Sequence, residues 1–145
     1  MKLVIEQSAD QAEPEIIVRC GLIDPRLEQL IAQLRLFCFS IVAKRDGESR
    51  LVALEEVFYF ESVDDTTFLY RERDVFACDL KLWELEQQLA GTDFQRISKS
   101  CILNLQHLDR VRPLLDGRFA AILANGEQLT VNRHYVKAFK QKFGL

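Results

Sequence analysis

The sequence has few of the residues that mark special structural classes. Its 145 residues include six glycines and three prolines, which excludes collagen-like and Pro/Gly-rich disordered chains. A membrane-spanning helix needs roughly 20 apolar residues in a row, and the longest apolar stretch here, 36–43, is interrupted by Ser40. Glu6 and Asp10 interrupt the N-terminal segment too early for the apolar core of a signal peptide. We therefore expect a cytoplasmic protein.

Metal ligands are also sparse. The four cysteines are Cys20, Cys38, Cys78 and Cys101. No two of them are separated by the spacing of a zinc site, and His107 and His134 do not complete one. The sequence therefore predicts no metal site, and four buried free thiols in a reducing compartment.

Motifs for catalysis and cofactor binding are missing as well. The glycines are dispersed, so neither a Gly-rich phosphate loop nor a GxSxG nucleophile turn can be written. The adjacent acids Glu55-Glu56 and Asp64-Asp65 would point to opposite faces of a strand, which favours solvated turn charges over paired catalytic carboxylates. We expect neither an enzyme nor a bound cofactor.

The charge is unevenly distributed along the chain. The net charge of -3 divides into 4 basic and 6 acidic residues in 1–40, 6 and 13 in 41–95, and 9 and 3 in 96–145. A basic C-terminal third favours a polyanionic partner, because binding releases counterions. The alternative is an internal match, in which the basic third packs on the acidic middle.

Local patterns indicate a mainly β protein with short helices. Two β-type runs, 2–6 and 15–20, are followed by a helix that Asp24 would cap and Pro25 would begin. The apolar stripe of that helix consists of Leu27, Leu30, Ile31 and Leu34. Further strands are expected at 39–44, 50–54, 57–61, 66–71, 74–79, 94–98, 108–115, 118–124 and 127–131. The last three are joined by Asp116-Gly117 and Asn125-Gly126, which are strong hairpin signals.

Two short helices complete the pattern. One contains Leu82, Leu85 and Leu89 and ends near Gly91, and the other follows Asn132. The segment 99–106 fits either a helical turn or a loop.

An ordered set of motifs in the C-terminal part resembles the LytTR family of bacterial DNA-binding domains. The matching pieces are Val57-x-Tyr59-Phe60-Glu61-Ser62, Phe94-x-Arg96-Ile97-Ser98-Lys99-Ser100, Ile102-Leu103-Asn104, Val111, Pro113, Gly117-Arg118, Asn125-Gly126-Glu127 and Val131-x-Arg133-x-Tyr135-Val136. The resemblance covers residues 37–145. It implies small antiparallel β-sheets whose loops enter successive major grooves, in place of an inserted recognition helix.

The remaining residues, 1–36, are expected to form a β-β-α extension of two short strands and a helix. They are too few for a receiver domain and resemble the extension of stand-alone LytTR regulators through Glu13-Pro14-Glu15 and Ile17-x-Arg19-Cys20. We expect this extension to serve dimerisation or partner contact. Such regulators are often encoded beside a small membrane protein that restrains them, so the resemblance implies a homodimer and, as a candidate partner, such a membrane protein.

The resemblance also implies which residues contact double-stranded DNA. It places Arg133, Lys99 and Thr67 at three contact positions, although Asp64-Asp65 brings two negative charges into the Thr67 loop. A surface ion pair is the alternative role for Arg133.

Other polar residues are candidates on chemical grounds. Ser98 and Ser100 could donate to phosphate oxygens or cap a turn. Lys137, Lys140 and Lys142 could neutralise phosphates or form a solvated helix face, and Arg96 and Arg118 are ambiguous in the same way.

The hypothesis is a sequence-specific transcriptional regulator that recognises repeated half-sites. The alternatives are a protein-interaction module that binds a membrane or cytoplasmic partner, and a small β-rich sensor for a metabolite.

Overall fold

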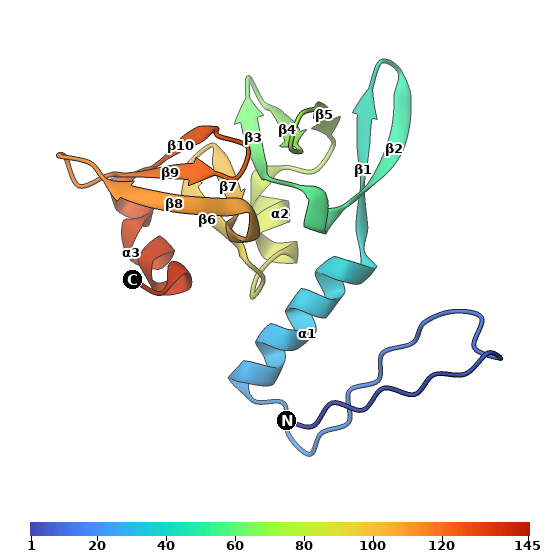
Figure 1. Ribbon diagram of the computed structural model, residues 1–145. Coiled ribbons are helices and arrows are strands. Elements are labelled where there is room, and N and C mark those ends of the chain that lie inside the picture. The colour runs from blue at the N-terminus through green and yellow to red at the C-terminus, as the bar shows by residue number, and fades with distance from the viewer.

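Two antiparallel β-sheets form most of the molecule in the computed structural model, which describes all 145 residues (Figure 1). The larger sheet has the strand order β2-β1-β5-β4-β3-β7-β6. Its strands are β1 (Ser40–Arg45), β2 (Glu48–Ala53), β3 (Tyr59–Val63), β4 (Thr66–Tyr70), β5 (Val75–Cys78), β6 (Phe94–Ser98) and β7 (Cys101–Asn104). The 3-10 turn Leu54–Glu56 separates β2 from β3 where the sequence places Glu55-Glu56.

The smaller sheet is a meander of the last three strands. They are β8 (Leu108–Pro113), β9 (Phe119–Leu123) and β10 (Gln128–Val131), in the order β10-β9-β8. Both Asx-Gly turns form as expected, with Gly117 and Gly126 at φ +85° and +90°, where a side chain would be strained. The Asn132 amide donates to the Ile97 carbonyl at 2.9 Å, so the end of β10 is fastened to β6 of the larger sheet.

The first helix, α1 (Pro25–Cys38), begins as the sequence predicts. Asp24 accepts a hydrogen bond from the Leu27 amide at 2.8 Å, and Pro25 occupies the first helical position. Leu36 packs into the core of the larger sheet, whereas Leu30 is exposed. Part of the apolar surface of α1 therefore packs against the larger sheet of the same chain. The domain boundary that the sequence predicts between residues 36 and 37 falls inside this helix.

The residues before α1 differ from the expectation. No strand forms at 2–6 or 15–20, and the only main-chain hydrogen bond within this segment is a turn bond from Gln11 to Ser8. Figure 1 shows the segment as two irregular arms that run beside each other, away from the sheets. The physical reason is that a two-stranded ribbon without a surface to cover is marginal in water, whatever its residue propensities. The prediction of two strands is wrong for this structure.

Strand β7 is the second difference, because the sequence suggests only a turn or loop at 99–106. All four of its residues are buried, and the strand pairs with both β3 and β6. Two apolar clusters meet here. One lies between the larger sheet and α2 (Leu82–Gln88), and the other lies between the larger sheet, the smaller sheet and α3 (Arg133–Phe143).

Asn104, at the end of β7, is the most enclosed polar side chain. It is 0% exposed, its Nδ2 donates to the Val57 carbonyl at 2.9 Å, and its Oδ1 accepts from the Gln106 amide at 3.1 Å. Its main-chain amide also donates to Phe58 at 2.9 Å. Asn104 therefore ties β7 to the segment that enters β3.

None of the three helices is both long enough and apolar enough to cross a membrane.

The cysteines divide into two pairs, which corrects the expectation of four buried thiols. All four are free, but Cys20 and Cys38 are exposed while Cys78 and Cys101 are buried. Cys20 lies on the unpaired N-terminal arm and Cys38 at the end of α1, where neither side chain meets a core.

We predict that two thiols react quickly with an aromatic disulfide reagent and two react only on unfolding. Burial raises the pKa of Cys101 to about 12 and also raises that of Cys78. Both thiols are therefore less ionised than an ordinary cysteine at a given pH, and a moderate rise in pH should leave their slow reaction slow. Cys20→Ser with Cys38→Ser should abolish the fast phase. Four fast equivalents in the native protein would contradict the buried placement.

Candidate nucleic-acid interface

Three segments that are distant in sequence meet at one end of the two sheets. The Ser62 amide donates to the Ser100 carbonyl at 2.8 Å, which brings the end of β3 beside the β6–β7 turn. The bond from Asn132 to Ile97 brings the start of α3 to the same turn. The edge is therefore built from the β3–β4 turn, the β6–β7 turn and the N-terminus of α3.

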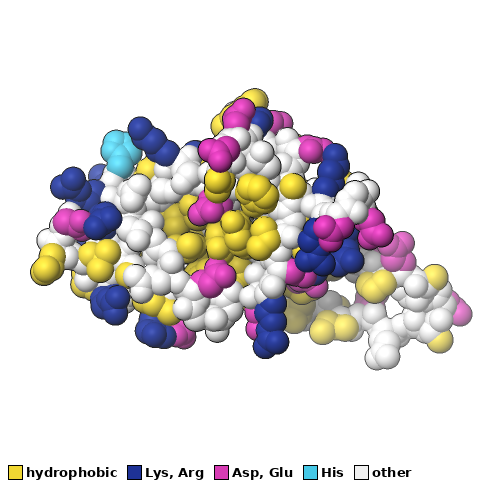
Figure 2. Space-filling model, turned by 90° about the horizontal axis from the view of Figure 1, so that it is seen from above, with side chains coloured by type: hydrophobic (Ala, Val, Ile, Leu, Met, Phe, Trp, Pro, Cys, Tyr) yellow, Lys and Arg dark blue, Asp and Glu magenta, His cyan; other side chains and the backbone are white.

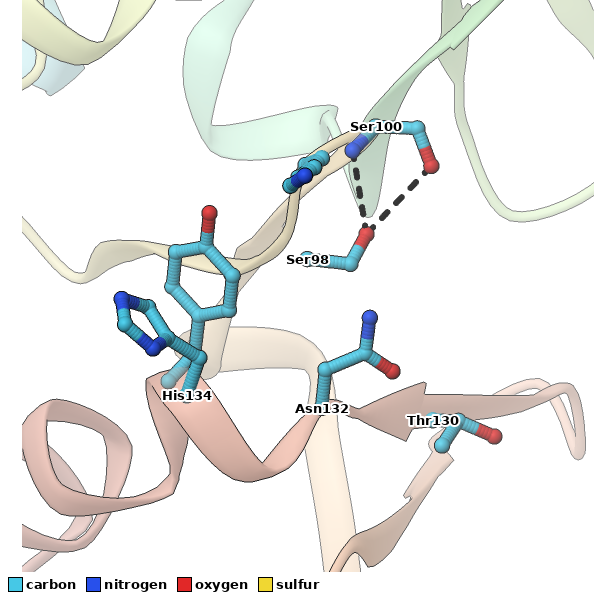
Figure 3. Close-up of a pocket in the computed structure, with 7 residues that line it drawn as sticks. Ser98, Ser100, Thr130, Asn132 and His134 are labelled. Carbon is cyan, nitrogen blue, oxygen red and sulfur yellow. Dashed lines mark hydrogen bonds between the residues drawn. The ribbon is translucent and has the colours of Figure 1, made fainter.

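A polar hollow of about 410 Å³ lies between the β6–β7 turn and α3. It is lined by Ser98, Lys99, Ser100, Thr130, Asn132, His134 and Tyr135. In Figure 3, Ser98 and Ser100 lie on one side, with Thr130, Asn132 and His134 on the other. No carboxylate lines the hollow, so its walls offer hydrogen-bond donors and a cation to a negatively charged ligand.

The β6–β7 turn is stabilised by its own serines. Ser98 Oγ accepts from the Ser100 amide at 3.2 Å and lies 3.4 Å from Ser100 Oγ. Of the two roles considered for these serines, turn capping is thus present in the structure. Lys99 projects from the turn as an exposed side chain that forms no ion pair.

Arg96 stabilises the β6–β7 turn through hydrogen bonds to its main chain. Its guanidinium donates to the carbonyls of Ser98 at 2.8 Å and Lys99 at 2.5 Å, and to Glu86 of α2 at 2.8 Å. These bonds occupy all three nitrogens, so Arg96 positions the backbone that carries Lys99. Sequence reasoning missed this role, because nothing in the local pattern shows that Arg96 turns back on its own strand.

Arg133 is the first residue of α3 and is exposed, as expected at the junction of strand and helix. Its side chain extends along the β8–β9 turn, where a Cβ added to Gly117 would lie 3.2 Å from Arg133 Cδ. It does not line the polar hollow and forms no ion pair. The aliphatic part of the Arg133 side chain thus lies against Gly117, while its guanidinium forms no ion pair.

Thr67, the third residue expected to contact DNA, is buried, unlike Lys99 and Arg133. It is 2% exposed within β4, where it pairs with Ser62 and Cys78, so its side chain does not reach the surface edge. The exposed threonine at this end of β4 is Thr66.

The acidic turn before β4 is partly neutralised. Asp64 and Asp65 both adopt left-handed φ angles, 49° and 66°. Lys81 Nζ donates to the Asp65 carbonyl at 2.8 Å and lies 3.6 Å from Asp65 Oδ1. The repulsion that these acids would exert on phosphate is therefore reduced by a cation that the sequence did not associate with them.

The lysines of α3 fall into two groups. Lys137 and Lys140 are exposed and form no ion pair, and Lys140 Nζ lies 5.1 Å from the centroid of the Phe119 ring. Lys142 instead donates to the Phe94 carbonyl at 3.1 Å, and burial lowers its pKa. Lys142 therefore fastens α3 to β6 more than it extends the charged surface.

Ion pairing distinguishes between the two interpretations of the basic C-terminal third. Only one of the eight ion pairs, Arg96 with Glu86, joins a basic residue of 96–145 to an acid of 41–95. Arg118 pairs locally with Asp116 at 2.6 Å. The cations of this third that are exposed and form no ion pair are Lys99, Arg112, Arg133, Lys137, Lys140 and Lys142, and of these Lys142 donates to a main-chain carbonyl. Figure 2 shows Lys and Arg side chains gathered over the end formed by the smaller sheet and α3.

The mainly β fold and this cationic edge are those of a DNA-binding protein. The chain belongs to the LytTr DNA-binding domain family, whose model matches residues 47–144. The match begins after β1, although β1 is part of the larger sheet.

Known proteins support the same family. A solved LytTr DNA-binding domain from Bacillus cereus superposes with a TM-score of 0.70 at 25% identity, covering 74% of this chain and 98% of that one. The sensory transduction protein LytT of Enterococcus faecalis is 33% identical over 101 residues, which are 68% of this chain and 42% of LytT. This chain therefore spans less than half of that relative.

A second kind of relative matches from end to end. A protein of Staphylococcus aureus, described as an uncharacterized HTH-type transcriptional regulator, is 23% identical over 147 residues, covering 100% of this chain and 99% of the relative. In this chain no two helices are consecutive elements, so it contains no helix-turn-helix pair.

Proposed function

We propose that this transcriptional regulator binds DNA through the edge formed by the β6–β7 turn, the N-terminus of α3 and the β3–β4 turn. The observation that carries the proposal is the set of exposed, unpaired cations at this edge, beside a hollow without a carboxylate. A guanidinium can donate two hydrogen bonds to guanine O6 and N7, whereas a lysine acts as a point charge. Arg133 is therefore the proposed base reader, with Lys99 as a second contact.

The serines and the helix lysines have supporting roles in this proposal. Ser98 and Ser100 line the hollow, and because one of the two hydroxyls donates to the other, one hydroxyl proton remains for a phosphate oxygen. Lys137 and Lys140 face solvent on α3, where they would neutralise phosphates beside the groove. Thr66, and not the buried Thr67, is the proposed contact from the β3–β4 turn.

We further propose that the regulator acts as a homodimer on repeated half-sites, because two linked contacts raise the effective concentration of the second. The N-terminal segment supports this proposal, since its apolar side chains are exposed. Restraint by a small membrane protein stays a prediction from the family resemblance.

The proposal is tested by the specificity of Arg133→Ala. A duplex is first selected from a randomised pool with the wild-type protein, and affinity is then measured for that duplex and for random DNA. We expect Arg133→Ala to cost about 1–3 kcal/mol on the selected duplex and less on random DNA. Lys137→Ala is the matched control on the same helix, and should weaken both complexes by similar factors.

Two results would count against the proposed function. If the wild-type protein enriches no sequence, it is not a sequence-specific regulator. If Arg133→Ala leaves the ratio of the two affinities unchanged while its melting temperature is also unchanged, Arg133 does not read bases, and specificity has to come from Lys99 or from DNA deformability.

A further inference from the structure

The larger sheet has one open edge. At its other edge, β6 is covered by α3 and fastened to Asn132, whereas β2 has no strand beyond it. An open edge presents unpaired main-chain donors and acceptors to any strand that can reach it.

This edge also carries an apolar strip. Val42 of β1 and Leu51 of β2 lie directly opposite each other, on the face turned away from the buried Ile41 and Val52. They are 50% and 71% exposed, respectively. The strip is therefore an apolar surface without a cover, next to free hydrogen-bonding groups.

The N-terminal segment has the complementary features. Residues 15–20 contain Ile16, Ile17 and Val18, of which the first two are 64% and 62% exposed. β-branched residues favour strands, yet this run pairs with nothing and lies apart from β2 in Figure 1. Residues 15–20 therefore have unpaired main-chain groups and exposed apolar side chains, and the β2 edge has the same two features.

We propose that residues 15–20 of one copy add as an antiparallel strand to the β2 edge of a second copy, reciprocally, and so form the homodimer. One register pairs two opposite charges and places two apolar residues of the arm on the face of the strip. It places Arg19 opposite Glu48, Val18 opposite Ser49, and Ile16 opposite Leu51. Ile16 and Val18 then cover the strip formed by Leu51 and Val42, while opposite charges face each other on the other side of the ribbon.

A second copy of the chain is the occupant because each copy carries both an arm and an edge. A two-fold axis lets both arms pair at once, so a closed dimer leaves neither feature exposed. The inference deepens the homodimer part of the proposed function, and it identifies the contact surface as separate from the DNA-binding edge.

The first test compares two exposed apolar positions in the full chain by sedimentation equilibrium. Leu51→Arg should raise the dimer dissociation constant at least about 10-fold, because it puts a charge in the covered strip. Trp83→Arg is the control: Trp83 is an exposed apolar residue on α2, away from β2, and its replacement should leave the constant unchanged. A monomeric wild-type protein, or equal effects of the two variants, would overturn the inference.

The second test examines the register with a disulfide. Val18→Cys with Ser49→Cys, in a Cys20→Ser and Cys38→Ser background, should give a covalent dimer on mild oxidation, because directly opposed residues bring their Cβ atoms within about 5.5 Å. Val18→Cys with Arg50→Cys is the control, since adjacent strand residues point to opposite faces. Cross-linked monomers would show that the arm pairs with its own β2. No cross-link, or one equally strong in the control, would contradict the register.

A charge exchange tests the same register without cysteine. Arg19→Glu and Glu48→Arg should each weaken the dimer about 2- to 5-fold, and the double variant should recover most of the loss. Additive losses would count against the pair.

DNA binding separates this inference from the proposed function. Leu51→Arg should still bind a single half-site like the wild-type protein, while losing the extra affinity for two half-sites. A wild-type protein that dimerises without binding DNA would contradict the function alone, and a wild-type protein that binds DNA but stays monomeric would contradict the inference alone.

Discussion

Affinity for a selected duplex is expected to fall about 1,000-fold when the salt concentration rises from about 50 to about 200 mM. The exposed and unpaired cations of the C-terminal third are free to replace counterions on phosphates. If about six phosphates are neutralised in the complex, the slope of log K against log salt is near -5. Fluorescence anisotropy titrations over a series of salt concentrations measure this slope.

The source of the slope is tested by removing charges in matched variants. Lys137→Gln with Lys140→Gln should make the slope shallower by about one for each phosphate that the variant no longer neutralises. Lys2→Gln removes a charge from the exposed N-terminal segment and should leave the slope unchanged. A wild-type slope near zero would favour the protein-interaction module over the regulator.

Asn104→Ala is expected to lower the free energy of unfolding by about 2–3 kcal/mol. The substitution leaves the buried Val57 carbonyl and the partly buried Gln106 amide without their partners. Urea unfolding followed by tryptophan fluorescence or circular dichroism gives the difference, provided that the denaturant slope is unchanged.

Gln106→Ala provides the control for this effect. Its side chain bonds to Gln33 and Asp93 at the exposed surface, so its loss should cost less than about 1 kcal/mol. Equal costs for the two variants would show that Asn104 does not hold the junction between β7 and β3.

The hairpins and the first helix were predictable because their signals are local. Asp116-Gly117 and Asn125-Gly126 define turns whose φ angles glycine adopts without strain, and Asp24-Pro25 defines a helix start that needs no tertiary contact. Elements whose existence depends on distant partners were not predictable in this way. Strand β7 forms because β3 and β6 lie on either side of it, and the arm at 15–20 stays irregular because no strand of its own chain lies beside it.

The residues of the candidate site also divide into those whose placement follows from local sequence and those whose placement depends on distant partners. Lys99 and Arg133 are exposed, one in a turn and the other at a helix start, because a turn and a helix start are fixed by local geometry. Thr67 is buried, since its exposure depends on where β4 begins, and the sequence does not fix that residue. The bonds of Arg96 and Lys81 depend on side-chain direction, which spacing along the chain does not reveal.

Helix α2 connects the two turns at this edge. Lys81, its N-cap, holds the Asp65 turn, and its Glu86 holds Arg96, which in turn holds the Ser98–Ser100 turn. One short helix thus bonds to both turns and contributes to their separation. In the proposed complex, a duplex whose grooves do not match that separation has to bend or twist to fit. The energy of that distortion depends on base steps that no side chain touches. The affinity of the protein for a DNA site would therefore depend partly on the stiffness of that site, because α2 influences the spacing to which the duplex has to adapt.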